Sequence, residues 1–157
     1  MKKGFYAGSF DPFTNGHLHV AIQALEVFDK LIIGIGDNVQ KTRRKDVFKM
    51  KDAIEKLFKR IGYGERTKVI IYRNEPSVKV DKENKCDFLV RGIRNDMDYQ
   101  YEENLASINQ EISGLDTIYF RAGELGNISS SMIMELMECG YDVSKYLPKE
   151  IYKIMKR

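Results

Sequence analysis

Residues 8–17, Gly-Ser-Phe-Asp-Pro-Phe-Thr-Asn-Gly-His, separate a short apolar run at residues 5–7 from a segment with helical hydrophobic spacing that begins at Leu18. This order predicts a strand, a loop and a helix. In an open α/β sheet, ligands bind beyond the carboxyl ends of the strands, where a helix N-terminus offers free N–H groups and a partial positive charge. The loop is therefore a candidate phosphate site.

Two glycines and one histidine strengthen this interpretation. Gly8 and Gly16 suit a ligand-binding loop, because a residue without a Cβ allows positive φ and a close approach of the backbone to a ligand. His17 is expected in the first helical turn, with its ring nitrogens within reach of a phosphate oxygen. Taken singly, these residues are more typical of an ordinary turn and a surface histidine than of a ligand site. Their combination carries the hypothesis.

The rest of the chain alternates apolar runs with amphipathic segments. Further strands are expected at residues 31–35, 69–72, 88–90 and 117–120. Helices are expected at residues 18–28, 47–61, about 78–84, 97–112 and 129–138, with a terminal helix that opens at Pro148. This alternation predicts one α/β domain over residues 1–157, with a doubly wound parallel sheet and right-handed crossovers. The loops after the first, second, fourth and fifth strands are expected to gather at one edge.

Composition excludes several classes of protein. Hydrophobic residues make up 43% and charged residues 31% of the 157 residues, which is typical of a globular domain. No apolar stretch approaches the roughly 20 residues that span a bilayer, and the start lacks the apolar region of a signal peptide, so we expect a cytoplasmic protein without a membrane partner. The net charge of +3 is too small to indicate nucleic-acid binding.

The metal-ligating residue types are few. Cys86 and Cys139 are far apart and lack the spacing of a zinc site or a secreted disulfide framework, so both are interpreted as buried or incidental thiols. His17 and His19 are the two histidines of the sequence, which excludes a histidine-rich metal cage. Any divalent ion is expected to arrive with a nucleotide.

A cationic loop follows the second predicted strand. Residues 37–45 include Lys41, Arg43, Arg44 and Lys45. Such a run is often a solvated surface, because exposed lysine and arginine are the norm. At the ligand edge of a sheet, however, these cations are also suited to hold a substrate phosphate.

Two arginines follow the fourth predicted strand, in Arg91-Gly92-Ile93-Arg94. The planar guanidinium group suits bidentate phosphate binding, and Gly92 permits close approach of a ligand. Glu102 lies on a different helical stripe from the apolar positions and is placed to accept hydrogen bonds from a ribose or an amine. The alternative is that both arginines form surface ion pairs with the nearby acids Asp96, Asp98, Glu102 and Glu103.

Serines 129–131 stand at the start of the helix expected at residues 129–138. Serine is a preferred N-cap residue, so simple capping explains at least one of them. A second helix N-terminus directed at a polyphosphate is the alternative interpretation.

Three motifs, residues 8–17, 91–94 with Glu102, and 128–131, occur in the order that is typical of a known family. Together they resemble the phosphopantetheine adenylyltransferases, which belong to the nucleotidyltransferase superfamily with a T/H-x-G-H motif. The resemblance implies a Rossmann-like nucleotidyltransferase fold. It also implies adenylyl transfer from ATP to 4′-phosphopantetheine, giving dephospho-coenzyme A and pyrophosphate, with Mg²⁺ as cofactor, a homohexameric assembly and inhibition by coenzyme A.

The resemblance also implies roles for particular residues. The expected catalytic residues are His17, Lys41 and Arg94. The expected binding residues for the acceptor are Ser9, Lys41, Ser77 and Arg91. The expected ATP-binding residues are Ser9, Phe10, His17, Gly92, Ile93, Arg94, Glu102, Leu125, Gly126, Asn127, Ile128, Ser129, Ser130 and Ser131.

Some positions depart from the family pattern. Position 9 is serine where the family usually has threonine, so the hydroxyl group is kept. The cationic loop lacks the usual proline residues, which leaves Lys41 and Lys45 as alternatives for one role. Residues 120–127 replace a segment that usually carries aromatic residues, and the region around Ser77 also matches poorly.

Two other functions stay open. One is a related transferase, such as a cytidylyltransferase acting on glycerol phosphate or a nicotinate mononucleotide adenylyltransferase, although those relatives generally carry histidine where this chain has Thr14. The other is a nucleotide-binding regulatory protein that keeps the fold without catalysis, which the altered loop before Asn127 permits.

Overall fold

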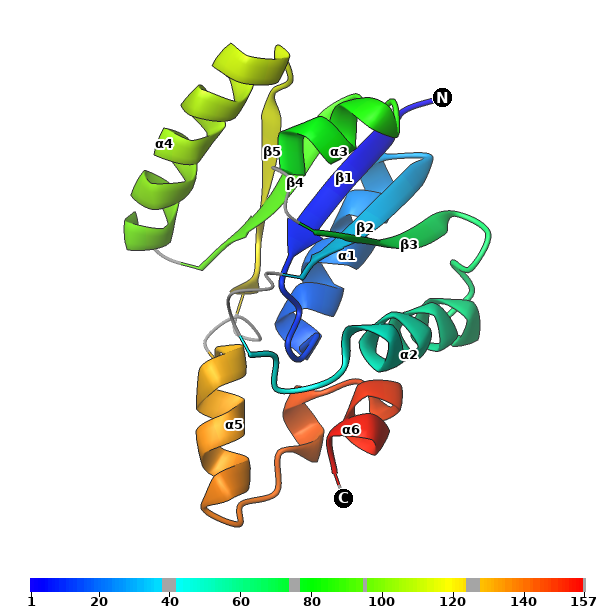
Figure 1. The fold of residues 1–157 in the computed structure, drawn as a ribbon, viewed down its shortest axis with the longest axis vertical. Helices are drawn as coiled ribbons and strands as arrows, with labels where there is room; N and C mark the ends of the chain where they lie inside the picture. Colours follow the sequence, from blue (N-terminus) through cyan, green and yellow to red (C-terminus); the bar gives the residue numbers. More distant parts are fainter. Residues whose placement is uncertain (38–41, 74–76, 95, 124–127, 157) are drawn as a thin grey trace.

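The computed structural model describes residues 1–37, 42–73, 77–94, 96–123 and 128–156 (Figure 1). Five parallel strands form one sheet in the order β3-β2-β1-β4-β5. The strands are β1 (Lys3–Gly8), β2 (Lys30–Gly36), β3 (Thr67–Tyr72), β4 (Phe88–Ile93) and β5 (Thr117–Arg121). The helices are α1 (Asn15–Val27), α2 (Val47–Arg60), α3 (Ser77–Glu83), α4 (Asp96–Ser113), α5 (Ser130–Glu138) and α6 (Lys149–Met155), with a short 3-10 turn at Ser144–Tyr146.

The alternation of side chains along each strand gives the sheet two buried faces. Tyr6 of β1 belongs to a core that is shared with α1, α2, α5 and α6. Its neighbour Phe5 belongs to a smaller core on the opposite face, where Val80 of α3 covers the sheet. Because successive residues of a strand point to opposite faces, apolar runs such as residues 31–35 indicate burial on both sides. The predicted doubly wound α/β fold is confirmed.

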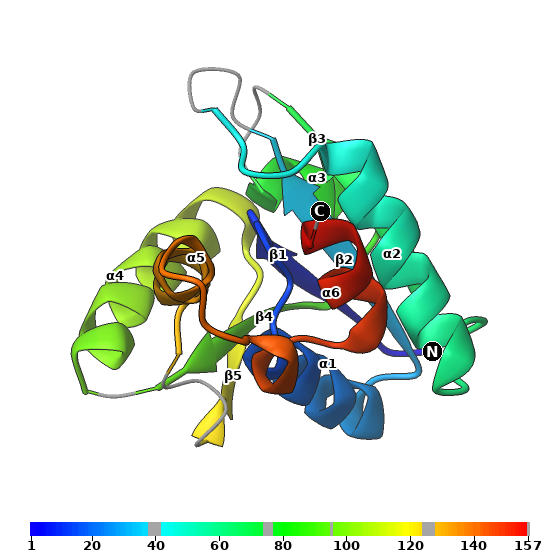
Figure 2. The ribbon, with the colours of Figure 1, turned by 90° about the horizontal axis from the view of Figure 1, so that it is seen from below.

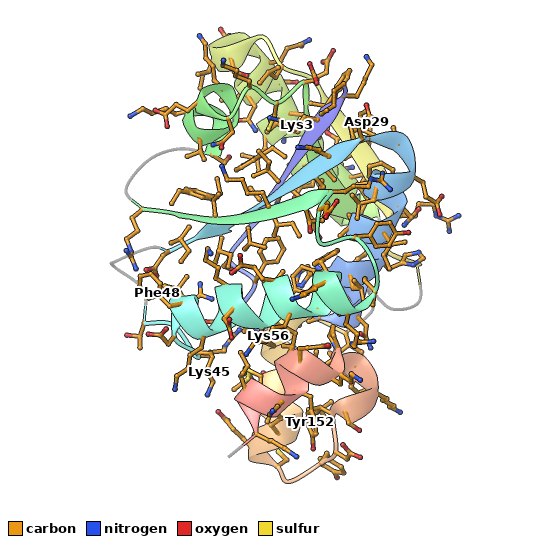
Figure 3. The ribbon with its side chains drawn as sticks, turned by 90° about the vertical axis from the view of Figure 1, so that its right-hand side faces the viewer. Lys3, Asp29, Lys45, Phe48, Lys56 and Tyr152 are labelled. Atoms are coloured by element: carbon orange, nitrogen blue, oxygen red, sulfur yellow. The ribbon has the colours of Figure 1, made fainter. Side chains whose placement is uncertain are left out.

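The helices divide between the two sides of the sheet. Figure 3 shows α2 running between the sheet and α6, in agreement with the contacts of α2 with both β3 and α6. Figure 1 shows α5 and α6 at the same end of the molecule, and in Figure 2, seen from that end, α4 lies to one side; it contacts β4 and α3. The two cores therefore differ in size because four helices cover one face.

Side-chain caps fix where the helices begin. Thr14 caps α1, Asp46 caps α2 by accepting hydrogen bonds from two backbone N–H groups, and Ser129 caps α5. Such caps satisfy backbone donors that have no partner inside the helix. Helix α1 therefore begins at Asn15, before the start at Leu18 that the apolar spacing indicates. Pro148 is the N-cap of α6 and precedes its first turn, whereas the sequence placed it inside that turn.

The two thiols have different environments. Cys86 is buried in the smaller core and Cys139 is exposed at the end of α5. Among the helices of the described ranges, none combines the length and the apolar character that crossing a bilayer requires.

The packing of Gly34 against Phe5 yields a stability prediction. A Cβ at position 34 would lie 2.5 Å from Cζ of Phe5, whose side chain is fully buried. Gly34→Ala is therefore expected to lower the free energy of unfolding by about 1–3 kcal/mol, the usual cost of overpacking a core. Urea denaturation measures this change.

The control is Lys30→Ala in the same strand, since Lys30 is exposed. A change within about 0.5 kcal/mol is expected there. Equal denaturation midpoints for wild type and Gly34→Ala would contradict this account of the packing.

Candidate functional site

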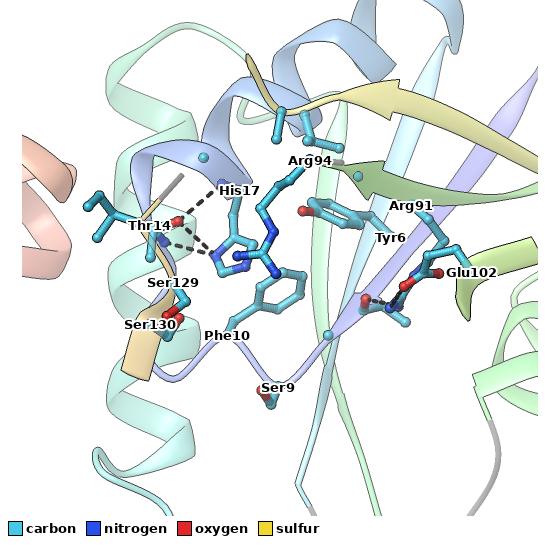
Figure 4. Close-up of a pocket in the computed structure, with 17 residues that line it drawn as sticks. Tyr6, Ser9, Phe10, Thr14, His17, Arg91, Arg94, Glu102, Ser129 and Ser130 are labelled. Atoms are coloured by element: carbon cyan, nitrogen blue, oxygen red, sulfur yellow. Dashed lines mark hydrogen bonds and ion pairs between the residues drawn. The ribbon is translucent and has the colours of Figure 1, made fainter. Parts of the chain in front are cut away.

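A cavity of about 320 Å³ opens at the carboxyl ends of β1 and β4 (Figure 4). The chain leaves β1 toward β2 and β3 on one side of the sheet, and β4 and β5 lie on the other side. The cavity thus lies at the switch point of the sheet, where open α/β folds bind their ligands. Ala7 and Gly8 line it from β1, and Arg91 and Gly92 line it from β4.

The cavity brings together ten of the residues expected from the sequence. They come from the first loop and α1, from β4 and α4, and from the segment before α5: Ser9, Phe10, His17, Arg91, Gly92, Arg94, Glu102, Ile128, Ser129 and Ser130. Three other described residues, Ile93, Ser77 and Ser131, do not line it. The remaining four, Lys41, Leu125, Gly126 and Asn127, lie outside the described residues.

His17 is held by the cap of α1. The backbone N–H of Thr14 donates to Nδ1 of His17 at 2.9 Å, and the backbone N–H of His17 donates to Oγ1 of Thr14 at 3.3 Å. This reciprocal pair is a capping box, with histidine in the position where glutamate or glutamine is usual. Because Nδ1 accepts a hydrogen bond, the proton of the neutral ring resides on Nε2.

The surroundings keep this imidazole neutral. Burial, and then the positive charges of Arg91 and Arg94, lower the pKa of His17 to about 4. Each effect disfavours a second positive charge on the ring. His17 therefore offers a neutral Nε2–H donor at physiological pH, and its contribution differs from the charge of the lysine and arginine residues with which the sequence analysis grouped it.

Two phenylalanines fix the orientation of the ring. The ring centroid of Phe10 lies 5.0 Å from that of His17 in an edge-to-face arrangement, and Phe13 lies 5.5 Å away. Phe10 has a φ of 44°, in a region that non-glycine residues rarely adopt. The expected positive φ falls on Phe10 and on neither Gly8 nor Gly16. Gly8 is needed for packing instead, because a Cβ there would lie 2.9 Å from the Phe10 ring.

Arg91 combines the two interpretations of its sequence motif. Its Nε and Nη2 donate to the two carboxylate oxygens of Glu102 at 2.7 and 2.9 Å, and Nη1 donates to the carbonyl oxygen of Ala7 at 2.9 Å. Burial alone would lower the pKa of Arg91, but the hydrogen bond and charge of Glu102 raise it above its usual value. Arg91 thus lines the cavity and is ion-paired at the same time.

The Glu102 carboxylate is consequently used in contacts within the protein. Its side chain is buried and both of its oxygens accept from Arg91. The sequence placed Glu102 as an acceptor for a ribose or an amine. In the structure, its first role is to orient Arg91 at the cavity wall.

Arg94 and Arg91 both line the cavity. In the view of Figure 4 the guanidinium group of Arg94 is drawn over the imidazole of His17, whose pKa its charge lowers, and the Arg91–Glu102 pair is drawn on the far side of Tyr6. Gly92, between them in β4, faces Val20 of α1, and a Cβ there would lie 2.8 Å from Cγ2 of Val20. The glycine is therefore required by packing of α1 on the sheet, as well as by any ligand.

The three serines have three different partners. Ser129 accepts a hydrogen bond from the N–H of Met132 at 3.1 Å as the N-cap of α5. Ser130 donates to the carbonyl oxygen of Pro12 at 2.9 Å. Ser131 accepts from Nη2 of Arg44 at 2.8 Å and does not line the cavity. Capping and contacts between loops thus account for one hydrogen bond of each of these hydroxyl groups.

Asp11 is a buried acid of the first loop to which the sequence analysis gave no role. It is 9% exposed, and its two carboxylate oxygens accept from the N–H groups of Arg44 and Lys45 at 2.7 and 3.0 Å. Arg43 lies 3.8 Å from the same carboxylate. The available signal was an acid in one loop and a cationic run in another loop at the same edge of the sheet.

The arrangement is suited to bind phosphate groups. The N-termini of α1 and α5, the Nε2–H of His17 and the guanidinium groups of Arg91 and Arg94 converge on one cavity. Helix N-termini and preorganised N–H donors stabilise negative charge. Among the described residues, no three histidine, cysteine, aspartate or glutamate side chains lie together as a metal site would require.

The chain matches the family model described as cytidylyltransferase-like over residues 5–136. It is 37% identical to a phosphopantetheine adenylyltransferase from Phocaeicola vulgatus, with 95% of this chain and 97% of the relative covered. It is 34% identical to a phosphopantetheine adenylyltransferase from Lactococcus lactis, with 99% of this chain and 95% of the relative covered. These matches extend over nearly the full length of both proteins.

Solved structures show the same fold at low identity. A putative nicotinate-nucleotide adenylyltransferase from Vibrio parahaemolyticus superposes with a TM-score of 0.66 at 16% identity, covering 99% of this chain and all of that one. The protein TmcAL from Thermotoga maritima, bound with alpha-thio ATP, superposes with a TM-score of 0.67 at 17% identity, covering 99% of this chain and 55% of that one.

The lowered pKa of His17 predicts a pH dependence of stability. In the unfolded chain the imidazole has a pKa near 6.5, whereas burial, Arg91 and Arg94 lower it to about 4 in the folded protein. Between these values the unfolded state binds the extra proton, so stability falls as the pH falls from 6.5 toward 4. Urea denaturation of wild type and His17→Gln at pH 7 and pH 5 measures this contribution.

The stability difference between wild type and variant is expected to change by about 2 kcal/mol between the two pH values, against wild type at the lower pH. His19→Gln is the matched control, because His19 is exposed on the same helix. A difference that does not change with pH would show that His17 is not held neutral.

Proposed function

The chain belongs to the phosphopantetheine adenylyltransferases, within the cytidylyltransferase-like proteins, and on this premise we propose that it transfers the adenylyl group of ATP to 4′-phosphopantetheine. The products are dephospho-coenzyme A and pyrophosphate. The observation that carries the proposal is the convergence of the His17 imidazole, two arginines and two helix N-termini on one cavity.

The chemistry requires positioning more than proton transfer. A phosphate monoester has a second pKa near 6, so the acceptor phosphate is largely anionic at neutral pH and needs no general base. It attacks the α-phosphorus of ATP, and the bond from this phosphorus to the bridging oxygen breaks to release pyrophosphate. The barrier is lowered by in-line alignment and by donors that neutralise charge on the phosphoryl oxygens.

The residues divide between the two substrates. For the nucleotide, the proposal assigns the Nε2–H of His17, the guanidinium of Arg94 and the N-terminus of α5 to the phosphates. Arg91 would hold the acceptor phosphate, together with Ser9. Three of the five N–H groups of Arg91 bind Glu102 and Ala7, which leaves two for a phosphate while Glu102 keeps the group in place. Lys41 remains an expected partner of that phosphate.

Magnesium would enter with ATP. The ion binds through one or two carboxylates at most, completed by water and the oxygens of substrate phosphates. Glu102 is the acid among the described residues that line the cavity, and both it and Asp11 in the loop after β1 already accept hydrogen bonds from the protein. We therefore assign the ion to the polyphosphate, where it neutralises charge, and give it no dedicated protein ligand.

Three wider properties belong to the same proposal. We propose a cytoplasmic location, a homohexamer and inhibition by coenzyme A, all from membership of the family. The exposed side chains of Tyr99, Ile108 and Ile112 on α4 support self-association, because apolar surface gathered on one helix favours burial. Sedimentation of the purified protein tests the assembly.

A pyrophosphate-release screen tests the function. The screen pairs ATP or CTP with phosphopantetheine, glycerol phosphate or nicotinate mononucleotide in the presence of Mg²⁺. Release is expected for ATP with phosphopantetheine and is expected to stop when Mg²⁺ is chelated. Release with another pair would identify a different transferase of the superfamily, and no release with any pair would indicate a nucleotide-binding protein without catalysis.

The role of His17 predicts a specific kinetic defect. His17→Ala removes one neutral donor to the reacting phosphates, and loss of one such donor typically costs about two to three orders of magnitude in rate. ATP affinity is expected to change much less, because arginine and helix N-termini remain. Turnover and equilibrium ATP binding are measured in parallel.

The exposed His19, changed to alanine, provides the control and should keep turnover within about twofold of wild type, as surface substitutions usually do. Near-normal turnover in His17→Ala would remove His17 from the mechanism.

A further inference from the structure

Arg44 connects three segments that are distant in the sequence. Its Nη1 donates to the carbonyl oxygen of Asp11 at 2.7 Å, and its Nη2 donates to Oγ of Ser131 at 2.8 Å. Its backbone N–H also donates to the Asp11 carboxylate at 2.7 Å. These partners are 33 and 87 residues away along the chain. One side chain therefore joins the loop after β1, the loop after β2 and the N-terminus of α5.

The position of Arg44 separates it from the substrate-binding groups. Arg44 is not among the described residues that line the cavity, and it is exposed. Its three anchored segments carry groups that the proposed function assigns to different substrates. The loop after β2 also holds Lys41 and Lys45, and α5 presents its N-terminus to the nucleotide. Arg44 thus lies outside the cavity and links the two loops to the N-terminus of α5.

Arg43 has a different and more local role. Its Nε donates to the carbonyl oxygen of Lys45 at 3.0 Å, and Nη1 donates to that of Ser9 at 2.9 Å. These bonds shape the loops after β1 and β2 but do not reach α5. Arg44 is the arginine of this pair that spans all three segments.

We infer that Arg44 is a positioning residue. It fixes the loop after β2, which the proposed function assigns to the acceptor phosphate, against the N-terminus of α5, which the proposed function assigns to the nucleotide. The inference rests on the proposed function. In-line transfer requires the acceptor phosphate and the α-phosphate to be held at a defined separation, and a displacement of about 1 Å lowers the rate by up to about a hundredfold. The bridge from Asp11 through Arg44 to Ser131 sets this separation without touching either substrate.

Removing either end of the bridge tests the inference. Arg44→Ala and Ser131→Ala are each expected to lower kcat by about tenfold to a hundredfold. The dissociation constant of ATP, measured by titration, and the KM of the acceptor are expected to change less than about threefold, because the binding groups themselves remain. The double variant is expected to match Arg44→Ala, since that change already breaks the hydrogen bond to Ser131 together with the one to Asp11.

A lysine variant separates geometry from charge. Arg44→Lys keeps the positive charge but replaces the planar fork that reaches two acceptors with a compact ammonium group. It is expected to remain as slow as Arg44→Ala. Full recovery of kcat in Arg44→Lys would mean that Arg44 acts by charge alone and would overturn the inference.

Arg60 provides a matched control at the other end of α2. Its guanidinium group also bridges two segments, by donating to both carboxylate oxygens of Glu150 on α6, far from the cavity. Arg60→Ala is expected to leave kcat and both substrate affinities unchanged. An equal loss of kcat in this variant would show that any broken inter-segment contact has the same effect.

Other outcomes contradict the inference directly. A rise in the acceptor KM of Arg44→Ala with unchanged kcat would make Arg44 a phosphate ligand. Additive losses in the double variant, with weakened ATP binding in Ser131→Ala, would place Ser131 on the nucleotide.

Hydrogen exchange keeps this test independent of activity. Peptides that cover residues 42–46 and 129–133 are expected to exchange faster in both Arg44→Ala and Ser131→Ala than in wild type. Unchanged exchange would overturn the bridge even in an active enzyme. Absence of pyrophosphate release by wild type would refute the proposed function, while the exchange result would still report on the bridge.

Discussion

The hydrogen bond from the N–H of Thr14 to Nδ1 of His17 is the interaction on which the site depends. It starts helix α1 at the end of the first loop, and thereby directs a helix N-terminus at the cavity. It also uses the Nδ1 lone pair, so the single proton of the neutral ring lies on Nε2. One bond thus sets a fold boundary, a ring orientation and the protonation of the group proposed to meet the reacting phosphates.

Electrostatic compensation explains how several cations can surround this neutral ring. Glu102 accepts from Arg91 at the cavity wall. Asp11 accepts from backbone N–H groups of the loop after β2 and lies near Arg43. Each acid holds a cationic segment in place before any substrate binds. Preorganised donors of this kind lose little energy to reorganisation during the reaction. The two acids therefore act through the arginines and the loop that they orient.

The fold was largely predictable from the sequence, because hydrophobic periodicity directly reflects burial. The continuous apolar run at residues 31–35 indicated a strand covered on both faces, and it is the second strand of the sheet. The glycines were less predictable. Gly8 and Gly92 were explained by ligand approach, yet their missing Cβ atoms make room for Phe10 and Val20. A sequence shows that a Cβ is absent but does not show which neighbour occupies the space.

The sequence by itself determined the element order and the family, since these follow from local spacing and from motifs read along the chain. The tertiary structure decided which polar groups meet. In it Arg91 binds Glu102, and Arg44 donates a hydrogen bond to Ser131. The Asp11 carboxylate accepts from a loop more than thirty positions away. For each charged side chain the sequence offers several candidate partners of suitable chemistry. The three-dimensional path of the backbone selects among them, because a hydrogen bond acts over about 3 Å.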